Sequence, residues 1–374
     1  MNAASHPIQR PRDARLLAVD AGGALRHMPR ARLPELFDTG DLLVANDAAT
    51  LPASLCGIHL SSGLPIEVRL AGRRTLDAAD VRAFTALVFG AGDHRTRTED
   101  RTLPPRLQGG DALALGPLHA RVLRTLAHPR LVELAFDGPP DAVWAGIAAH
   151  GQPIQYAHIA EPLALWDVWS AVAAHPVAFE PPSAGFVLDW ALLHDLRRRG
   201  IGFATLTHAA GISSTGDAAL DARLPFDEAY DLPPATARAI AATRARGGRV
   251  VALGTTVARA LEHAATQTPP LRAGPGLATQ RLGARSRLAV VEAILSGTHE
   301  RGTSHHELLR AFASDAVLAD ADVALERHGY RTHEFGDSMW VERATAAPGA
   351  QPRSNLKTAT LASRFGQRLT TLPL

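Results

Sequence analysis

Short apolar stretches separated by glycine, proline and polar residues predict alternating strands and helices along most of the chain. Residues 15–28 alternate around an Ala-Gly-Gly-Ala turn, which predicts a β-hairpin. The run from Leu42 to Ala45 is continuously apolar and ends at Asn46-Asp47. Such a run is typical of a buried strand that leads into a functional loop.

Residues 52–140 carry short strand-like runs at regular intervals, separated by glycine and proline pairs. This spacing predicts an antiparallel barrel or sandwich inserted between helix-containing segments. After residue 140 helices and strands alternate, which indicates an α/β body. Helices are expected over residues 141–149, 163–173, 188–199 and 233–246, with strands over residues 202–207 and 249–253.

The predicted fold class is therefore α/β, with a mainly parallel-sheet body and an inserted antiparallel β-barrel domain. We assign residues 1–51 and 141–343 to the body and residues 52–140 to the barrel. Residues 344–374 contain four basic residues and no acidic one. They are expected to form a basic, loosely ordered tail.

Composition narrows the class of protein without naming a function. Of the 374 residues, 46% are hydrophobic and 20% charged, which is typical of a soluble globular protein. The 39 basic and 37 acidic residues nearly balance, so any polyanion site has to be local. Cys56 is the single cysteine, and no apolar run is long enough to cross a membrane. A cytoplasmic protein without a membrane segment is expected.

Common cofactor and metal signatures are absent from the sequence. Neither GxGxxG after a strand nor GxxxxGK[ST] occurs, which argues against an ordinary dehydrogenase or ATPase. His299, His305, His306 and Glu307 lie close in sequence, but their spacing matches neither HExxH nor a facial triad. We therefore expect no metal site.

The segment VVALGTTVARALE, residues 250–262, is the most informative of the chain. A buried strand runs through Gly254 into a helix that begins with Thr255 and Thr256. Hydroxyls and free N–H groups then lie at the positive end of the helix dipole, where a carboxylate or a hydroxylated ligand can bind. The structural alternative is that Thr255 only caps the helix and that Arg259 pairs with Glu262.

Three motifs in order give the chain a family resemblance. Residues 40–55 read GDLLVANDAATLPASL and resemble the family motif GDLLVxNxTRVxPARL. Residues 254–262 keep the motif GTTxxRxLE, and residues 336–339 keep the motif GD[AS]M. The chain resembles, over most of its length, the S-adenosylmethionine-dependent tRNA ribosyltransferase-isomerases of queuosine biosynthesis. Residues 182–185 stand where that family has Pro-Thr-Ala-Gly, and Glu228 keeps the acidic member of its His-x-Glu.

The departures from the family pattern fall at charged and titratable positions. Ala49 and Ser54 replace two arginines, while Val187 and Phe226 replace two histidines. Each lost arginine removes a partner for phosphate or carboxylate, and each lost histidine removes a proton carrier. The pattern favours a relative with a changed substrate.

The resemblance implies a reaction and a set of site residues. The family moves the ribosyl part of S-adenosylmethionine, which is a substrate, onto a 7-deazaguanine in tRNA and releases adenine and methionine. The sulfonium acidifies the neighbouring 5′ protons, so one general base can start the reaction. The implied catalytic residues are Glu228, His299 and Asp337; those implied to bind S-adenosylmethionine are Asn46, Ser183, Gly185, Gly254, Thr255, Thr256 and Arg259.

Three functions remain open from the sequence. The first is the family reaction on tRNA, with weakened tRNA binding because the two arginines are lost. The second is the same sulfonium chemistry on a small molecule such as a free 7-deazapurine. The third is a catalytically inactive binding relative. In each case a monomer is expected.

Overall fold

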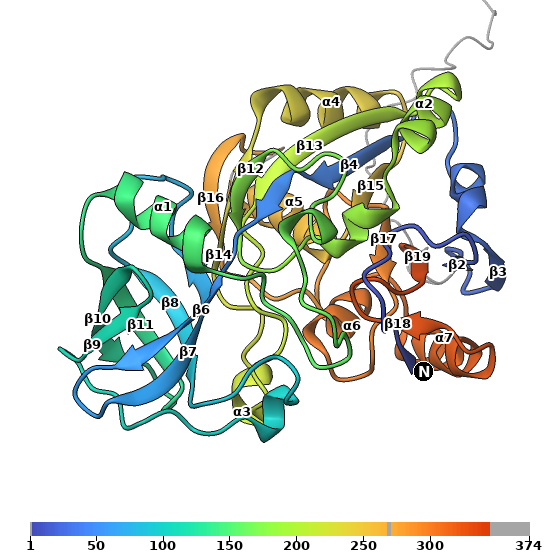
Figure 1. The fold of residues 1–374 in the computed structure, drawn as a ribbon. Helices are drawn as coiled ribbons and strands as arrows, with labels where there is room; N and C mark the ends of the chain where they lie inside the picture. Colours follow the sequence, from blue (N-terminus) through green and yellow to red (C-terminus); the bar gives the residue numbers. More distant parts are fainter. Residues whose placement is uncertain (1, 268–270, 345–374) are drawn as a thin grey trace, which may run out of the picture. The chain divides into compact units, whose positions relative to one another are not determined.

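The structure is a computed structural model that describes residues 2–267 and 271–344. In this part of the chain, nine strands form one large mixed sheet (Figure 1). Its middle strands β13, β4, β15 and β17 are parallel neighbours, as are β19 and β2, and the other neighbours are antiparallel. In sheet order the strands are β16 (Gly274–Ala278), β14 (Glu228–Leu232), β13 (Gly202–His208), β4 (Leu42–Asn46), β15 (Val250–Leu253), β17 (Ala293–Gly297), β19 (Ser338–Glu342), β2 (Arg15–Val19) and β3 (Leu25–Pro29).

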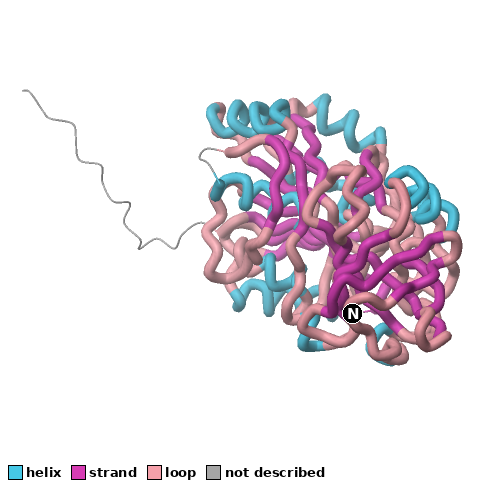
Figure 2. Tube along the Cα trace, turned by 90° about the vertical axis from the view of Figure 1, so that its left-hand side faces the viewer, coloured by secondary structure: helices cyan, strands magenta, loops and turns pink. Residues whose placement is uncertain are grey.

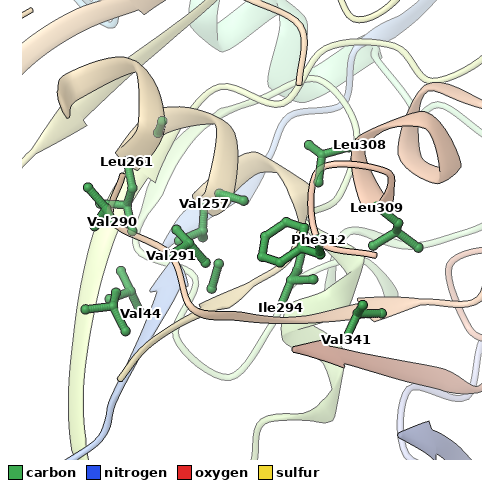
Figure 3. Packing of buried hydrophobic residues seen from close by; sticks show 14 of the residues in the cluster. Val44, Val257, Leu261, Val290, Val291, Ile294, Leu308, Leu309, Phe312 and Val341 are labelled. Atoms are coloured by element: carbon green, nitrogen blue, oxygen red, sulfur yellow. The ribbon is translucent and has the colours of Figure 1, made fainter. Parts of the chain in front are cut away.

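The large sheet is buried on both faces, which explains why its strands read as continuous apolar runs. Side chains alternate along a strand, so Leu42 and Val44 of β4 pack in one cluster and Leu43 and Ala45 in the other. On the first face, helices α5 (Thr255–Gln267) and α6 (Ser304–Leu309) and the segment that follows α6 cover the strands, and Phe312 packs among their side chains (Figure 3). The second face is covered by α2 (Trp190–Arg198) and two short 3-10 helices.

Six further strands of the described chain close into an antiparallel barrel (Figure 1). Its interior is apolar, and helix α1 (Pro140–His150) contributes Val143 and Ile147 to the same cluster. The barrel strands are, in order around it, β10 (Leu118–Thr125), β11 (Leu131–Phe136), β8 (Phe84–Phe89), β7 (Leu64–Arg73), β6 (Ser54–His59) and β9 (Ala112–Leu115). The predicted α/β class with an inserted antiparallel barrel is thus confirmed, although the sheet of the body is mixed.

The helices lie outside the strands (Figure 2). They are α1 (Pro140–His150), α2 (Trp190–Arg198), α3 (Ala218–Asp221), α4 (Pro234–Ala245), α5 (Thr255–Gln267), α6 (Ser304–Leu309) and α7 (Asp315–Arg327), with 3-10 helices at Arg30–Leu36, Thr98–Asp100, Leu165–Asp167 and Ser183–Val187. Two small parallel pairs complete the described structure: β1 (Asn2–Ala3) with β18 (Arg331–Thr332), and β5 (Ala48–Thr50) with β12 (His175–Ala178). None of the described helices is long and apolar enough to span a membrane.

The helix predicted over residues 163–173 is wrong. Only Leu165–Asp167 forms a 3-10 turn there. The carbonyl of Val168 accepts a hydrogen bond from the Thr50 hydroxyl at 3.0 Å, and Trp169 donates to the Thr50 carbonyl at 2.9 Å. The first of these bonds engages a backbone carbonyl that a longer helix would have used, and the second holds the Trp169 side chain against β5. The predicted hairpin is confirmed as β2 and β3, and the predicted tail lies outside the described residues apart from Ala344.

Glu262 of α5 ties this helix to the segment before β17. Its carboxylate accepts three backbone N–H groups, from Ala289 at 2.6 Å, Val290 at 2.9 Å and Val291 at 2.8 Å. Arg259 is not its partner, so the predicted alternative of a pair across one helical turn is wrong for these two residues.

Because three backbone N–H groups depend on the Glu262 carboxylate, we expect its removal to destabilise the fold strongly. Glu262→Ala leaves buried N–H groups without acceptors, so the free energy of unfolding should fall by about 2 to 4 kcal/mol. Urea unfolding measures this change. Glu326→Ala, on the exposed side of α7, is the control and should change stability by less than about 0.5 kcal/mol. Equal effects of the two substitutions would contradict the assignment.

Candidate functional site

A cavity of about 480 Å³ lies where the parallel strands of the large sheet end. Strands β13, β4, β15 and β17 run in the same direction, so their carboxyl ends meet at one edge. The segments that follow β13, β15 and β17 line the cavity, together with residues 97–99 from the barrel. Ligands of α/β proteins bind at this edge of the sheet.

An ion pair between Glu228 and Arg259 forms one buried wall of the cavity. Glu228 begins β14, and its second carboxylate oxygen accepts the N–H of Gly211 at 2.6 Å. Arg259 of α5 also donates to the carbonyls of Gln280 at 2.9 Å and Ala278 at 2.7 Å. Both side chains are therefore held rigidly by several partners.

The start of α5 faces the cavity as the sequence predicts. Gly254, Thr255 and Thr256 all line it, and so does Ser183 from the 3-10 helix after β12. Gly254 has a φ of 96°, in the left-handed region that favours glycine. A side chain there would also approach Ala184 to 3.1 Å, which explains the glycine at this turn.

His299 also lines the cavity, beside a second histidine that the sequence analysis did not assign to the site. The rings of His299 and His305 stack with centroids 4.4 Å apart. Nδ1 of His305 hydrogen-bonds the Thr255 hydroxyl at 3.0 Å. Burial, with the neighbouring histidines, lowers the pKa of His299 well below its ordinary value, so its imidazole is neutral at neutral pH.

Glu180 is a cavity residue that sequence reasoning missed. It lies in a short proline-containing segment after β12, where no motif marks it. Its carboxyl accepts hydrogen bonds from the Tyr156 hydroxyl and, at 3.0 Å, from the Ser213 N–H. Burial raises the pKa of Glu180 to about 7, so at neutral pH this group exists in both protonation states.

A second missed group consists of His158, His333 and Glu334, which all line the cavity. Among the described residues, no arginine or lysine pairs with this group. His158 comes from the loop after α1, whereas His333 and Glu334 follow β18. No sequence signal links residues so far apart. The four residues that raised the question of a metal motif do not converge: His306 contacts Asp322, and Glu307 contacts Arg310.

Three residues predicted for the site do not line the cavity. Asp337 is buried and accepts hydrogen bonds from the backbone N–H groups of Arg15 at 2.8 Å and Arg331 at 2.9 Å. Its motif position therefore serves the packing of β2 beside β19, and the structure places this predicted catalytic residue away from the cavity. Asn46 and Gly185 are likewise buried parts of the scaffold.

Asn46 supports the cavity from behind. Its side-chain oxygen accepts the N–H of His208 at 3.0 Å, and its amide donates to the His208 carbonyl at 2.9 Å. His208 is fully buried, with Nε2 3.4 Å from the Glu228 carboxylate. Burial lowers the pKa of His208 to about 4, so the ring stays neutral behind the ion pair.

Comparison with known proteins gives the family. The family model described as "Queuosine biosynthesis protein" matches residues 1–341. The S-adenosylmethionine:tRNA ribosyltransferase-isomerase of Moorella thermoacetica is 30% identical over 353 residues, covering 90% of this chain and 95% of that protein. The protein of the same name from Gloeobacter violaceus is 34% identical over 338 residues, covering 88% and 90%. This chain belongs to the queuosine biosynthesis protein family.

A solved structure also aligns with most of the chain. The S-adenosylmethionine tRNA ribosyltransferase from Thermotoga maritima matches with a TM-score of 0.47 and 23% identity, covering 90% of this chain and 95% of that chain.

Because the pKa of Glu180 is raised, we expect the stability difference between the natural protein and Glu180→Gln to depend on pH. Between pH 4.5 and about 7 the folded protein keeps a proton that the unfolded chain has lost, so stability falls as pH rises through this range. Glu180→Gln has no proton to lose; its amide oxygen can accept from the Ser213 N–H, and its NH2 group can donate to the Tyr156 oxygen, which reverses that hydrogen bond. Above pH 7 it should exceed the natural protein in stability by up to about 3 kcal/mol, with little difference below pH 4.5.

Urea unfolding of both proteins at pH 4.5 and pH 8 measures this difference, with Glu326→Gln as an exposed control. A stability difference of the same size at both pH values would show that Glu180 titrates normally.

Proposed function

We propose that this chain transfers and isomerises the ribosyl part of S-adenosylmethionine onto a 7-deazaguanine base carried by tRNA. The observation that carries the proposal is the convergence of the retained motif residues on one cavity. Glu228, Arg259, Thr255 and His299 come from three separate segments of the sequence, since Thr255 and Arg259 share α5, and they line the same space. Family membership and the names of the relatives support the same function.

The charge of the cavity supports a cationic ligand. S-adenosylmethionine carries a sulfonium and an ammonium group against one carboxylate, which leaves a net positive charge. Glu300 and Glu334 line the cavity without an arginine or lysine partner among the described residues. Carboxylates in a partly enclosed site attract such a cation more strongly than in open water.

The titratable groups of the cavity support the two proton transfers that the reaction needs. A base has to remove a proton beside the sulfonium, and adenine has to leave with a proton or a hydrogen bond. We assign the first task to the neutral imidazole of His299 and the second to Glu180, whose pKa of about 7 makes it an efficient acid. Both oxygens of Glu228 already accept hydrogen bonds, so we assign Glu228 to holding Arg259 and the Gly211 loop.

A small-molecule acceptor is the second candidate, and one observation favours it. The two positions where the family carries arginines do not face a phosphate-binding surface: Ala49 is buried, and the Ser54 hydroxyl donates to Glu67 at 2.8 Å. Arg69 and Arg101, which are buried, also contact Glu67. Both guanidiniums are therefore buried against Glu67, which compensates one of the two positive charges, and they are not free to bind phosphates at the surface.

The decisive experiment measures release of adenine and methionine from S-adenosylmethionine by chromatography. The protein is incubated with tRNA that carries 7-aminomethyl-7-deazaguanine, with the free base, or with neither. Release that depends on tRNA supports the proposal, and release with the free base alone supports the second candidate. Absence of release in every arm, together with no thermal shift from S-adenosylmethionine, would contradict both.

The tRNA arm is repeated with a chain that ends at Ala344. Loss of tRNA-dependent release on truncation would place the phosphate contacts in residues 345–374. Unchanged release would place them in the described part of the protein.

His299→Ala should lower the rate of adenine release by about 100-fold or more, because it removes the proposed proton acceptor. The matched control is His119→Ala, which removes an exposed histidine from barrel strand β10 and should leave the rate unchanged. Both variants are first compared with the natural protein by circular dichroism and thermal unfolding. A folded His299→Ala protein with the normal rate would exclude His299 as the base.

A further inference from the structure

The cavity contains a cluster of two histidines and one carboxylate to which the proposed reaction assigns no proton transfer. The possible ligand atoms of His158, His333 and Glu334 all lie within 4.8 Å of one another. Nε2 of His158 is 3.1 Å from a Glu334 carboxylate oxygen, and the rings of His158 and His333 stack with centroids 4.4 Å apart. We propose that these three residues bind a divalent transition-metal ion, for which Zn²⁺ is the best chemical fit.

The distances suit a tetrahedral site. With Zn–N and Zn–O bonds of about 2.0 to 2.2 Å, neighbouring ligand atoms lie about 3.3 Å apart. The contact between His158 and Glu334, at 3.1 Å, is already close to this length. The His333 ring, which stacks on that of His158, would have to turn so that the in-plane lone pairs of both rings meet at one point. Two imidazoles and a carboxylate form a ligand set that catalytic zinc sites use, with the fourth position left to water or substrate. All three residues line the cavity, so the fourth position faces it.

The backbone at His333 provides an independent observation. Its φ of 69° makes it the one residue other than glycine with a positive φ in the described chain. Such a conformation is strained for a residue with a side chain, and it persists where the surrounding structure imposes it. Here the Gly336 N–H donates to the His333 carbonyl at 3.0 Å, and the ring is held against His158.

The electrostatic surroundings favour a cation over further protons. Within the described residues, no hydrogen bond engages the His333 ring nitrogens. The negative charge of Glu334 adds to burial in raising the pKa of Glu180, and Glu300 acts electrostatically on His333, so two more carboxylates surround the cluster. A divalent ion would compensate this charge.

The test measures metal binding directly, on full-length protein without a polyhistidine tag. Chelator-treated protein is titrated with Zn²⁺ by calorimetry and with Co²⁺ by visible absorption, where a tetrahedral site gives intense bands. One Zn²⁺ should bind per chain with a dissociation constant in the micromolar range or below. His158→Ala, His333→Ala and Glu334→Gln should each weaken binding by at least tenfold.

Matched controls separate the cluster from other histidines. His119→Ala and His175→Ala remove exposed histidines and should bind Zn²⁺ as the natural protein does. Glu334→Gln preserves shape and keeps the test valid if a histidine variant fails to fold. Absence of binding at micromolar Zn²⁺, or binding that all three cluster variants retain, would overturn the proposal. Because S-adenosylmethionine is absent from this experiment, its result is independent of the adenine-release assay.

Discussion

The buried ion pair between Arg259 and Glu228 is the interaction on which the cavity depends. The guanidinium of Arg259 in α5 also binds the carbonyls of Ala278 and Gln280, and the carboxylate of Glu228 in β14 also binds the Gly211 N–H. One pair thus joins a helix, two strands and the loop after β13. Removing either partner would leave an uncompensated buried charge, at a cost of about 3 to 5 kcal/mol. The shape of this wall and the stability of the fold are therefore constrained together.

Much of the fold could be predicted because each element carries its own local signal. The hairpin of β2 and β3, the buried strand β4 and the helix α5 after Gly254 follow from apolar periodicity and turn residues. The prediction failed over residues 163–173, where the apolar pattern suits a helix but the Thr50 hydroxyl donates a hydrogen bond to the Val168 carbonyl. That hydrogen bond joins residues far apart in sequence, so local propensity does not reveal it.

The site was only partly predictable for the same reason. Motif residues on one element, such as Thr255 and Arg259, could be assigned to the cavity because the strand-to-helix turn fixes their direction. Asp337 belongs to an equally specific motif yet binds backbone N–H groups in the scaffold. Glu180 and His333 lie in loops and gain their chemistry from burial and from partners on other segments, which no single segment of sequence encodes.

The charge of the cavity suits the S-adenosylmethionine donor, whereas the phosphates of a tRNA acceptor need a different surface of the protein. Glu300 and Glu334, which have no arginine or lysine partner among the described residues, line the cavity, and the barrel arginine that lines it, Arg97, contacts Glu99. This field attracts the sulfonium donor and repels phosphates. A tRNA acceptor would therefore present only its base to the cavity, while its phosphates would need arginines elsewhere on the surface. Changes at the phosphate-binding surface can then alter the acceptor without disturbing the donor site. The sequence agrees with this separation, because the chain keeps GTTxxRxLE while Ala49 and Ser54 replace family arginines.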